Sequence, residues 1–488
     1  MTIVDVHCHS FNADDIPARG FVQRVLLRNI AVLKLAAEAL DALGQGMAPG
    51  FAQEDPELSR MLTTQVASRA ILRAPQPSLD AEANDLLTHL RETQPGVVND
   101  AEAELAAEAG QDAASADRAL FGADRALLVV KWVVLIGKAR WRITSMLMDT
   151  YPEVDLFVSM LVDLEPGLHD IAPASIREQV ELHEKVSRLS MLGRLTNGRA
   201  RVHPFIGFDP RRELASRKRA DLKGPLALVK EAVCDYGYVG VKLYPPMGFR
   251  PMGNQATSEM TSEEGAAVDE ILHELYKWCE EEHVPVTAHC NPSNEAAEEY
   301  INFSEPANWA KVLTDHPELR LDFGHFGGLQ ITEAPDRWPE EFAALIADHH
   351  HVYADTGNHD TDHRTNHILD LDAYLGVLKA LFTQFPDAQG RFMFGTDWYM
   401  NALHPKYGAF LDEYRSRFTT TFGDQATERF LGEAALEYLG FKDPDNHNCQ
   451  RLWARYQTYA ADDVPAWLTR PTDSDAANPP QDPGRSHG

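Results

Sequence analysis

The sequence predicts an α/β protein built on a (β/α)8 TIM barrel, with a long helical insertion after strand one and further helices at the C-terminus. Eight short apolar, β-rich runs occur along the chain, at residues 3–9, 154–162, 201–208, 238–243, 284–289, 320–325, 351–355 and 391–397. Helical patterns separate most of them, at residues 174–192, 224–235, 262–282, 294–314, 338–349 and 365–385. Apolar strands that alternate with helices are typical of a parallel sheet covered by helices, and eight of them indicate a closed barrel.

The interval between the first two strands, residues 11–150, contains no convincing strand. Its helical blocks span residues 21–43, 80–91, 100–109 and 116–148, and Gly-rich or Pro-rich joints at 44–46 and 74–77 interrupt them. We expect an insertion whose last helix returns to the barrel. Two roles stay open: a lid that shapes the substrate site, or packing and dimerisation alone.

The domain organisation follows from these patterns. We expect strand one at residues 1–10, the insertion with the first barrel helix at 11–150, and the rest of the barrel at 151–402. Helices at 409–418, 425–438 and 445–458 would pack on the barrel within a C-terminal region of residues 403–465. Residues 466–488 form a tail rich in Pro, Asp, Ser and Gly, a composition that predicts disorder.

Composition excludes several classes of protein. The chain is 44% apolar and 24% charged, which is ordinary for a globular protein with a large core. Its formal net charge of −29 opposes binding to nucleic acids or anionic membranes, although the charge names no substrate. Neither a signal peptide nor a membrane-spanning segment is evident, and the cysteines lack C-x-x-C spacing. These features predict a soluble cytoplasmic protein with reduced thiols. The protein is also a possible homodimer, with the insertion as a candidate dimer contact.

The first strand ends in His7-Cys8-His9. Side chains at positions i and i+2 of a strand share a face, so His7 and His9 point one way and Cys8 points the other way. Two imidazoles at the carboxyl end of a strand are suitable ligands for Zn²⁺. A single His-x-His pair is nevertheless common by chance, and its interpretation depends on the other strands.

Four more strands end in polar residues, and a barrel brings such strand ends together at its active face. Strand four carries Lys242, strand five ends in His289, strand six ends in His325, and strand eight leads into Asp397. Each residue alone has a structural explanation, such as a hydrogen-bonded histidine or a helix cap. Together with the first strand, they form a set that chance does not explain.

The ordered set of motifs resembles the amidohydrolase superfamily, and within it the amidohydrolase 2 branch of metal-dependent hydrolases and aminocarboxymuconate-semialdehyde or γ-resorcylate decarboxylase relatives. The motifs that carry this resemblance are His7-x-His9, His289, His325 with its Gly-Gly pair, and Gly395-Thr396-Asp397-Trp398. Residues 204–211 and 240–243 also fit the branch. The resemblance covers residues 1–10 and 154–400, and the insertion has no recognised counterpart.

The resemblance implies a binding site for one divalent metal, most often Zn²⁺, with Mn²⁺ as the alternative. Its ligands would be His7, His9, His289 and Asp397. It also implies that Asp397 is the acid–base residue and that His325 polarises the substrate or assists proton transfer. Lys242 has two open roles, substrate binding or, after carboxylation, bridging of two metals.

Other residues receive more limited predictions. Arg250 is a candidate for binding a substrate carboxylate through its guanidinium, and Tyr244 and Trp398 are candidate apolar walls of the substrate pocket. Asp355 is expected to hydrogen-bond within the site without direct chemistry. The run at residues 349–351 is expected to be a solvated helix end. A cysteine nucleophile is not expected, because Cys8 points away from its histidine neighbours.

Three functions remain open at this stage. The first is metal-dependent hydrolysis of an ester, lactone or amide bond in a small carboxylated or aromatic molecule. The second is non-oxidative decarboxylation of an aromatic or unsaturated carboxylic acid at the same site. The third is a noncatalytic barrel with a structural metal, which the dispersed ligands and the carboxylate disfavour because structural zinc sites are usually closed by four Cys or His ligands.

Overall fold

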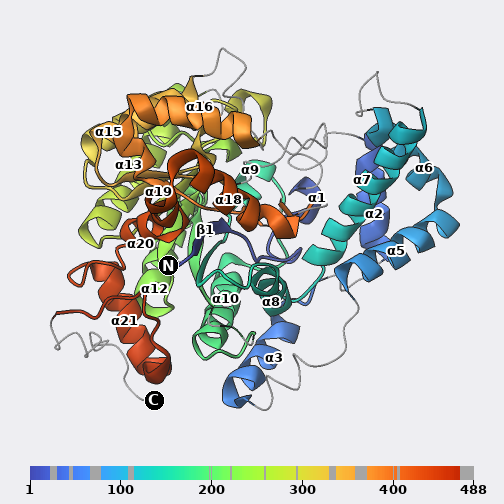
Figure 1. The fold of residues 1–488 in the computed structure, drawn as a ribbon, viewed down its shortest axis with the longest axis horizontal. Coiled ribbons are helices and arrows are strands. Elements are labelled where there is room, and N and C mark those ends of the chain that lie inside the picture. The colour runs from blue at the N-terminus through green and yellow to red at the C-terminus, as the bar shows by residue number, and fades with distance from the viewer. Residues whose placement is uncertain are drawn as a thin grey trace.

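A computed structural model of the chain contains the predicted barrel (Figure 1). It describes residues 1–472 except 22–29, 43–47, 66–77, 108–114, 197, 199, 220–222, 258–259, 293–294, 329–336, 358–370, 399–400 and 404–406. The eight strands are β1 (Val4–Cys8), β2 (Leu156–Met160), β3 (Arg201–Phe208), β4 (Gly240–Leu243), β5 (Val286–His289), β6 (Leu321–Gly324), β7 (Val352–Asp355) and β8 (Phe392–Met393).

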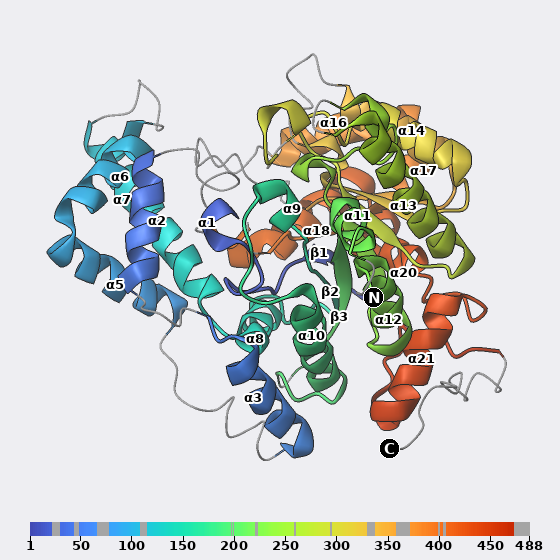
Figure 2. The same cartoon turned by 180° about the vertical axis from the view of Figure 1, so that it is seen from behind.

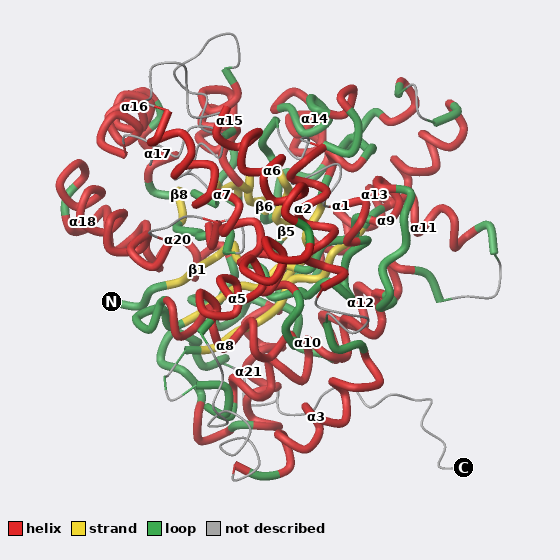
Figure 3. Tube along the Cα trace, turned by 90° about the vertical axis from the view of Figure 1, so that its right-hand side faces the viewer, coloured by secondary structure: helices red, strands yellow, loops and turns green. Residues whose placement is uncertain are grey.

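All eight strands are parallel, and each pairs with the next one along the chain. The barrel closes where the segment after β8 runs beside β1, through a parallel bridge between Cys8 and Trp398. The Val6 amide also donates to the Phe394 carbonyl at 3.0 Å. Figure 3 shows the strands in the middle of the molecule with helices around them. The predicted fold class is therefore confirmed.

Helices follow the strands on the outside of the barrel. They are α9 (Glu165–Leu168), α10 (Ile176–Met191), α11 (Pro210–Arg217), α12 (Pro225–Asp235), α13 (Ser262–Glu281), α14 (Pro306–Asp315), α15 (Trp338–Asp348), α16 (Leu371–Gln384) and α17 (Pro386–Gln389). Local sequence explains several of their starts. Ser175 and Thr261 form capping boxes with Glu178 and Glu264 at the first turns of α10 and α13.

Seven described helices connect β1 to β2. They are α1 (Ala18–Phe21), α2 (Ile30–Ala42), α3 (Phe51–Thr63), α5 (Leu79–Thr93), α6 (Pro95–Ala107), α7 (Ser115–Ile136) and α8 (Arg140–Thr150). Helices α2, α5, α6 and α7 stand together to one side of the barrel, at the right of Figure 1 and the left of Figure 2.

The helices differ from the sequence prediction in several places. The helix expected at 116–148 is two helices, because Gly137, Lys138 and Ala139 end α7 before α8 begins. Helices α3 and α11 were not predicted, and only α14 and a short 3-10 turn occupy the helix expected at 294–314. The joint at 44–46, the joint at 74–77 and residues 365–370 of the expected helix at 365–385 lie outside the described residues.

A buried ion cluster ties α3 and α8 to the segment that follows β1. The Arg140 guanidinium donates to both carboxylate oxygens of Asp15, at 2.9 and 2.6 Å, and to Glu54 at 2.6 Å. All three side chains are buried. Because Asp15 lies a few residues beyond the His7–His9 motif, this cluster attaches the helices after β1 to the strand that carries the candidate site.

The C-terminal helices pack on the barrel. They are α18 (Phe410–Phe422), α19 (Asp424–Glu428), α20 (Ala434–Tyr438) and α21 (His447–Tyr459), with a π-helical turn at Arg429–Glu433. Side chains of α20 and α21 share a buried cluster with the interior residues Val4, Leu156 and Phe205. These helices therefore close the end of the barrel where the strands begin. Most of the predicted tail, residues 473–488, lies outside the described residues.

The barrel interior is divided between apolar and polar side chains. Strands β1 to β3 contribute Val4, Leu156, Val158, Met160 and Phe205 to one buried cluster. On β4 to β6 the register pairs Lys242 with Thr287 and Thr287 with Asp322, so three polar side chains stand next to one another. Asp355 of β7 continues this polar side, and all four residues are buried.

No helix in the described part of the chain is both long and apolar enough to cross a membrane.

Candidate active site

The predicted site residues lie at the carboxyl ends of the strands. His7 is in β1, and a register irregularity between Asp5 and Cys8 interrupts the pairing of β1 with β2 there. A bulge of this kind re-aims side chains and is common beside active sites. It allows Val4 and Val6 to join the interior cluster while His7 and His9 also face the site.

His9 faces a carboxylate. Its Nδ1–H donates to the Met160 carbonyl at 2.8 Å, which leaves Nε2 with a lone pair in the neutral ring. That Nε2 lies 3.1 Å from Oδ1 of Asp397. A lone pair and a carboxylate oxygen repel at this distance unless a cation or a proton lies between them. The pair therefore fits a cation-binding site.

His7 is held at both ring nitrogens. Its Nδ1–H donates to Oδ2 of Asp355 at 2.7 Å, and its Nε2 accepts from the Lys242 ammonium at 3.1 Å. Burial lowers the pKa of His7, although the Asp355 charge opposes this shift. The ring is consequently neutral, with its Nε2 lone pair directed into the site.

Asp355 organises the strands around it. Besides His7, it accepts from the backbone N–H of His325 at 3.1 Å and of Gly357 at 2.7 Å. Burial opposes its charge, but the interaction with His7, the nearby His325 and a hydrogen bond from Asp322 hold the pKa of Asp355 well below its usual range. Asp355 is therefore an anion that orients two neighbouring histidine segments, in agreement with the supporting role predicted for it.

His325 and His289 form the adjoining wall. The Nδ1–H of His325 donates to the Gly357 carbonyl at 2.8 Å, so its Nε2 is also the basic nitrogen. Its ring centroid lies 4.7 Å from that of His7 and 4.5 Å from that of His289. Burial, reinforced by the two neighbouring histidines, lowers the pKa of His325 well below its ordinary value. The predicted proton-transfer residue is therefore a neutral base.

Asp397 has an unusual backbone and a low pKa. Its φ of 49° is in the left-handed region, and its N–H donates to the His7 carbonyl at 2.7 Å. Burial opposes ionisation, but the contact with His9 and the nearby His325 lower the pKa of Asp397 to about 2. The carboxylate is therefore charged at neutral pH, as both a metal ligand and a general base require.

Part of the chain also resembles a known protein family in sequence. A sequence model of the family described as amidohydrolase matches residues 214–441, which contain β4 to β8 and with them Lys242, His289, His325 and Asp397. This match covers just under half of the chain, and over that segment the chain resembles the family that the sequence motifs predicted. No curated protein has significant sequence similarity to this chain.

The solved structures that match this chain are only remotely similar to it. A zinc-bound amidohydrolase from Burkholderia multivorans is 16% identical at a TM-score of 0.38, over 60% of this chain and 86% of that one. Amidohydrolase 2 from Bifidobacterium longum subsp. infantis is 12% identical at a TM-score of 0.34, over 61% and 86%. A putative metal-dependent hydrolase from Lactobacillus casei is 12% identical at a TM-score of 0.39, over 90% and 96%.

The donor set of this protein fits a divalent cation. Among the described residues, one atom from each of His7, His9 and Asp397 lies within 4.8 Å of the others, and the same holds for His7, His325 and Asp355. Histidine nitrogens and carboxylate oxygens are ligands that Zn²⁺ prefers. Three of the four predicted ligands are thus together, and the fourth, His289, adjoins them through the His325 ring.

Lys242 lies inside the barrel, next to the same group. Burial lowers its pKa, whereas the charges of Asp355 and Asp397 act in the opposite direction. Its amine is hydrogen-bonded to His7, so it is within reach of the candidate metal site. This position is compatible with both roles left open by the sequence.

The predicted substrate-binding residues have different environments. Tyr244 stacks on His289, with ring centroids 4.3 Å apart and an interplanar angle of 17°, and so lines the site. The Arg250 guanidinium lies 5.1 Å from the Phe303 ring centroid, and its Nε has no hydrogen-bond partner within the described residues. Trp398 is buried in the large hydrophobic cluster around the barrel.

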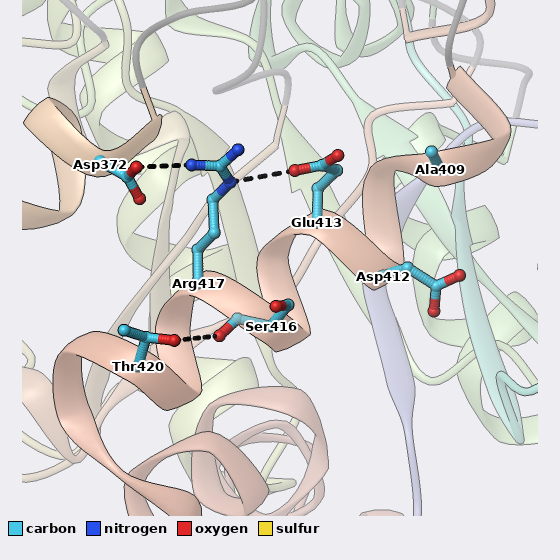
Figure 4. A pocket seen from close by; sticks show the side chains of 7 residues that line it. All are labelled: Asp372, Ala409, Asp412, Glu413, Ser416, Arg417 and Thr420. Atoms are coloured by element: carbon cyan, nitrogen blue, oxygen red, sulfur yellow. Dashed lines mark hydrogen bonds and ion pairs between the residues drawn. The ribbon is translucent and has the colours of Figure 1, made fainter.

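Two features lie away from this site. A surface pocket between α16 and α18 contains Arg417 paired with Asp372 and Glu413, and none of the predicted site residues line it (Figure 4).

The histidine run at residues 349–351, at the end of α15, also lies away from the site. His350 and His351 lie 3.7 and 3.2 Å from Glu318. His350 is exposed, and His349 caps the end of α15, which matches the predicted solvated helix end.

Sequence reasoning missed the acceptors that orient the histidines. The Met160 and Gly357 carbonyls hold the Nδ1 atoms of His9 and His325. A backbone carbonyl is present at every residue, so no sequence signal could single these out. The Asp5 carboxylate was also missed, although its position two residues before His7 was a usable signal.

Proposed function

We propose that this protein is a metal-dependent hydrolase of the amidohydrolase type that cleaves an ester, lactone or amide bond in a small carboxylated or aromatic molecule. The observation that carries the proposal is the approach of His9 Nε2 to the Asp397 carboxylate at 3.1 Å while His9 Nδ1 is bonded elsewhere. Two basic atoms turned toward one point inside a barrel mouth form a site for a cation.

The proposed ligands of one divalent cation, Zn²⁺ or alternatively Mn²⁺, are His7, His9, His289 and Asp397. Such a cation supplies Lewis acidity, which makes water a nucleophile near neutral pH. Hydrogen bonds at Nδ1 of His7 and His9 fix both rings with Nε2 facing the site. Bonds of this kind raise ligand basicity and set the ring orientation.

Asp397 is the proposed general base and then general acid. Its carboxylate is ionised at neutral pH because its pKa is about 2. It would accept a proton from the attacking water and deliver that proton to the leaving group. The neutral His325, whose Nδ1–H donates to the Gly357 carbonyl, would accept a proton at Nε2 and so assist this transfer.

Substrate binding is assigned to the residues around the mouth. Tyr244, which lies flat on His289, would contact an apolar or aromatic part of the substrate. The Arg250 guanidinium would pair with a substrate carboxylate, since its planar fork matches two carboxylate oxygens. Trp398 would support the wall from behind, because its side chain is buried.

Lys242 leaves one alternative within this proposal. Its contact with His7, which belongs to both candidate ligand groups, is compatible with substrate binding and with a carboxylated lysine that bridges two metals. Metal analysis distinguishes the two. Two equivalents per chain, halved in Lys242→Ala, would support the bridge, whereas one equivalent in both proteins would leave Lys242 as a substrate-binding residue.

A second reaction class uses the same residues. In a decarboxylation of an aromatic or unsaturated acid, Arg250 would bind the substrate carboxylate, and Asp397 would take a proton from water and deliver it to the carbon that loses CO₂. Mass spectrometry of the products distinguishes the two reactions. Release of CO₂ without addition of water to the product would select decarboxylation over hydrolysis.

The first experiment is metal analysis by mass spectrometry of protein purified without chelators, beside a His7→Ala/His9→Ala variant. About one zinc or manganese per wild-type chain, lost in the variant, is the expected result, and it would justify a panel of carboxylated esters, lactones and amides. No bound metal after reconstitution would favour the noncatalytic barrel. The cytoplasmic location of the protein stays a prediction. The homodimer also stays a prediction, which a molar mass from light scattering tests.

A further inference from the structure

The seam between β8 and β1 carries most of the candidate site. Strand β8 pairs with β7 only at Phe392 and Met393, and the chain then turns to run beside β1. Along this seam, Asp397 N–H donates to the His7 carbonyl at 2.7 Å and His9 N–H donates to the Trp398 carbonyl at 2.5 Å. The distance between His7, His9 and Asp397 therefore depends on how this seam is held.

One buried carboxylate spans the seam. Asp5 is fully buried, and its Oδ1 accepts from the backbone N–H of Thr396 at 3.0 Å and of His7 at 3.3 Å. Its Oδ2 accepts from the Thr396 hydroxyl at 2.6 Å. The same hydroxyl accepts from the Trp398 N–H at 3.1 Å. The Asp5 carboxylate thus binds the backbone of the candidate ligand His7. It also binds the backbone and the side chain of Thr396, which directly precedes the candidate ligand Asp397.

The local backbone needs such support. Asp397 has a φ of 49°, a conformation that non-glycine residues disfavour and that persists only when the surroundings hold it. Strand β1 is irregular at the same level, between Asp5 and Cys8. Gly395 is packed so closely that an added Cβ would lie 2.8 Å from the Cβ of His7. The turn at residues 395–398 therefore has little freedom and a strained residue at its centre.

The other side of the turn is held in a similar way. The Thr356 hydroxyl, directly after β7, accepts from the Gly395 N–H at 3.0 Å and donates to the Gly395 carbonyl at 3.1 Å. The turn is thus attached to β7 through Thr356 and to β1 through Asp5. Only the attachment through Asp5 also contacts a residue with a candidate metal-binding side chain, His7.

We propose that Asp5 and Thr396 are positioning residues that set the spacing between His7 and Asp397 and thereby the affinity of the site for a divalent metal. The inference rests on the proposed function, because it presumes that these two side chains bind the metal. Asp5 itself belongs to none of the candidate ligand groups among the described residues, and each of its oxygens already accepts a hydrogen bond.

The test compares Thr396→Val with Thr396→Ser. Valine keeps the shape of threonine but removes the hydroxyl, so the Asp5 carboxylate loses one donor and the Trp398 N–H loses its acceptor. Serine retains the hydroxyl. We expect the Zn²⁺ affinity, measured by competition with a chromophoric chelator, to fall roughly 10–100-fold in Thr396→Val, as for other residues that orient metal ligands. Thr396→Ser should stay close to wild type.

A second readout separates positioning from mere stability. The visible absorption spectrum of the Co²⁺-loaded protein reports the ligand geometry, and we expect it to change in Thr396→Val and not in Thr396→Ser. A lower melting temperature of Thr396→Val with unchanged affinity and spectrum would overturn the inference. If Thr396→Val does not fold, Asp5→Asn takes its place, and unchanged affinity in that variant would also overturn it.

His7→Ala distinguishes the inference from the proposed function. If wild type binds Zn²⁺ and His7→Ala does not, the metal site stands, and the Thr396 pair then decides the inference alone. If wild type and His7→Ala bind equally, the proposed metal site fails and the inference fails with it.

Discussion

The two sides of the barrel interior perform the same task with different chemistry. On the apolar side, made by β1 to β3, the Met160 main-chain carbonyl accepts the Nδ1–H of His9. On the polar side, made by β4 to β7, the Asp355 carboxylate accepts the Nδ1–H of His7. Both acceptors direct a ring nitrogen into the site, but only the carboxylate adds a charge and can be removed by substitution.

The polar side also carries groups that the apolar side lacks. The Thr287 hydroxyl donates to Asp322 at 3.0 Å and accepts from the Tyr438 hydroxyl at 2.9 Å. Burial and the nearby Asp355 raise the pKa of Asp322 well above its ordinary value, so this carboxyl is neutral. The comparison teaches that one side of the barrel supplies packing and the other tunes the charge of the site.

The largest expected effect is on the catalytic rate, through Asp397 at the seam between β8 and β1. Asp397→Asn should lower kcat roughly 10²–10⁴-fold through lost acid–base catalysis. The measurement is steady-state hydrolysis once a substrate is found, with metal content determined for the same sample. Wild-type turnover in the variant would remove Asp397 from its assigned role.

A substitution on the apolar side should affect stability and leave the site intact. Leu156→Ala removes a fully buried side chain, and we expect the free energy of unfolding to fall by about 2–5 kcal/mol. Chemical denaturation measures this loss, and Leu156→Ile, which conserves volume, is the control. A change in the Zn²⁺ affinity of folded Leu156→Ala would contradict the division between the two sides.

A substitution on the polar side should have the opposite signature. Asp355→Asn removes the anion that orients His7, so the Zn²⁺ affinity should fall roughly 10–100-fold. Chelator competition measures the affinity, and Tyr353→Phe on the same strand is a matched control because it lies outside the site. Equal affinities in wild type and Asp355→Asn would show that the carboxylate is dispensable.

The smallest effect is the pH dependence of the metal-free protein. Folding lowers the pKa of Asp397 from 3.8 to about 2. The stabilisation is therefore fully present above pH 3.8 and is lost as the pH falls through 2, by up to about 2 kcal/mol. Urea denaturation of wild type and Asp397→Asn between these pH values tests this prediction. The same slope in both proteins would assign the dependence to other groups.

Much of the barrel could be predicted from local patterns. The strand predicted at residues 201–208 matches β3 at both ends, because a mainly apolar run is typical of a strand buried on both faces. The capping residues of α10 and α13 also mark their starts. The break between α7 and α8 was missed, since Gly137 is the only helix-breaking residue between them.

Strand β8 shows the limit of this reasoning. The sequence pattern extends over residues 391–397, but only Phe392 and Met393 form regular strand pairs with β7. Beyond them, the left-handed Asp397 turns the chain along β1. Thr396, beside this turn, donates two hydrogen bonds to Asp5, a residue 391 positions away, and no local pattern contains that contact.

The sequence by itself determined the barrel, the family and the residue types of the candidate site, because periodic burial and strand-end histidines are local properties of a chain. Only the tertiary structure decided which nitrogen of each histidine faces the site, since that depends on the Met160 carbonyl, Asp355 and the Gly357 carbonyl. It also decided the closing of β8 on β1 through Asp5 and Thr396. Acceptors of this kind lie far from the histidines in sequence, and closure of the barrel brings them into contact.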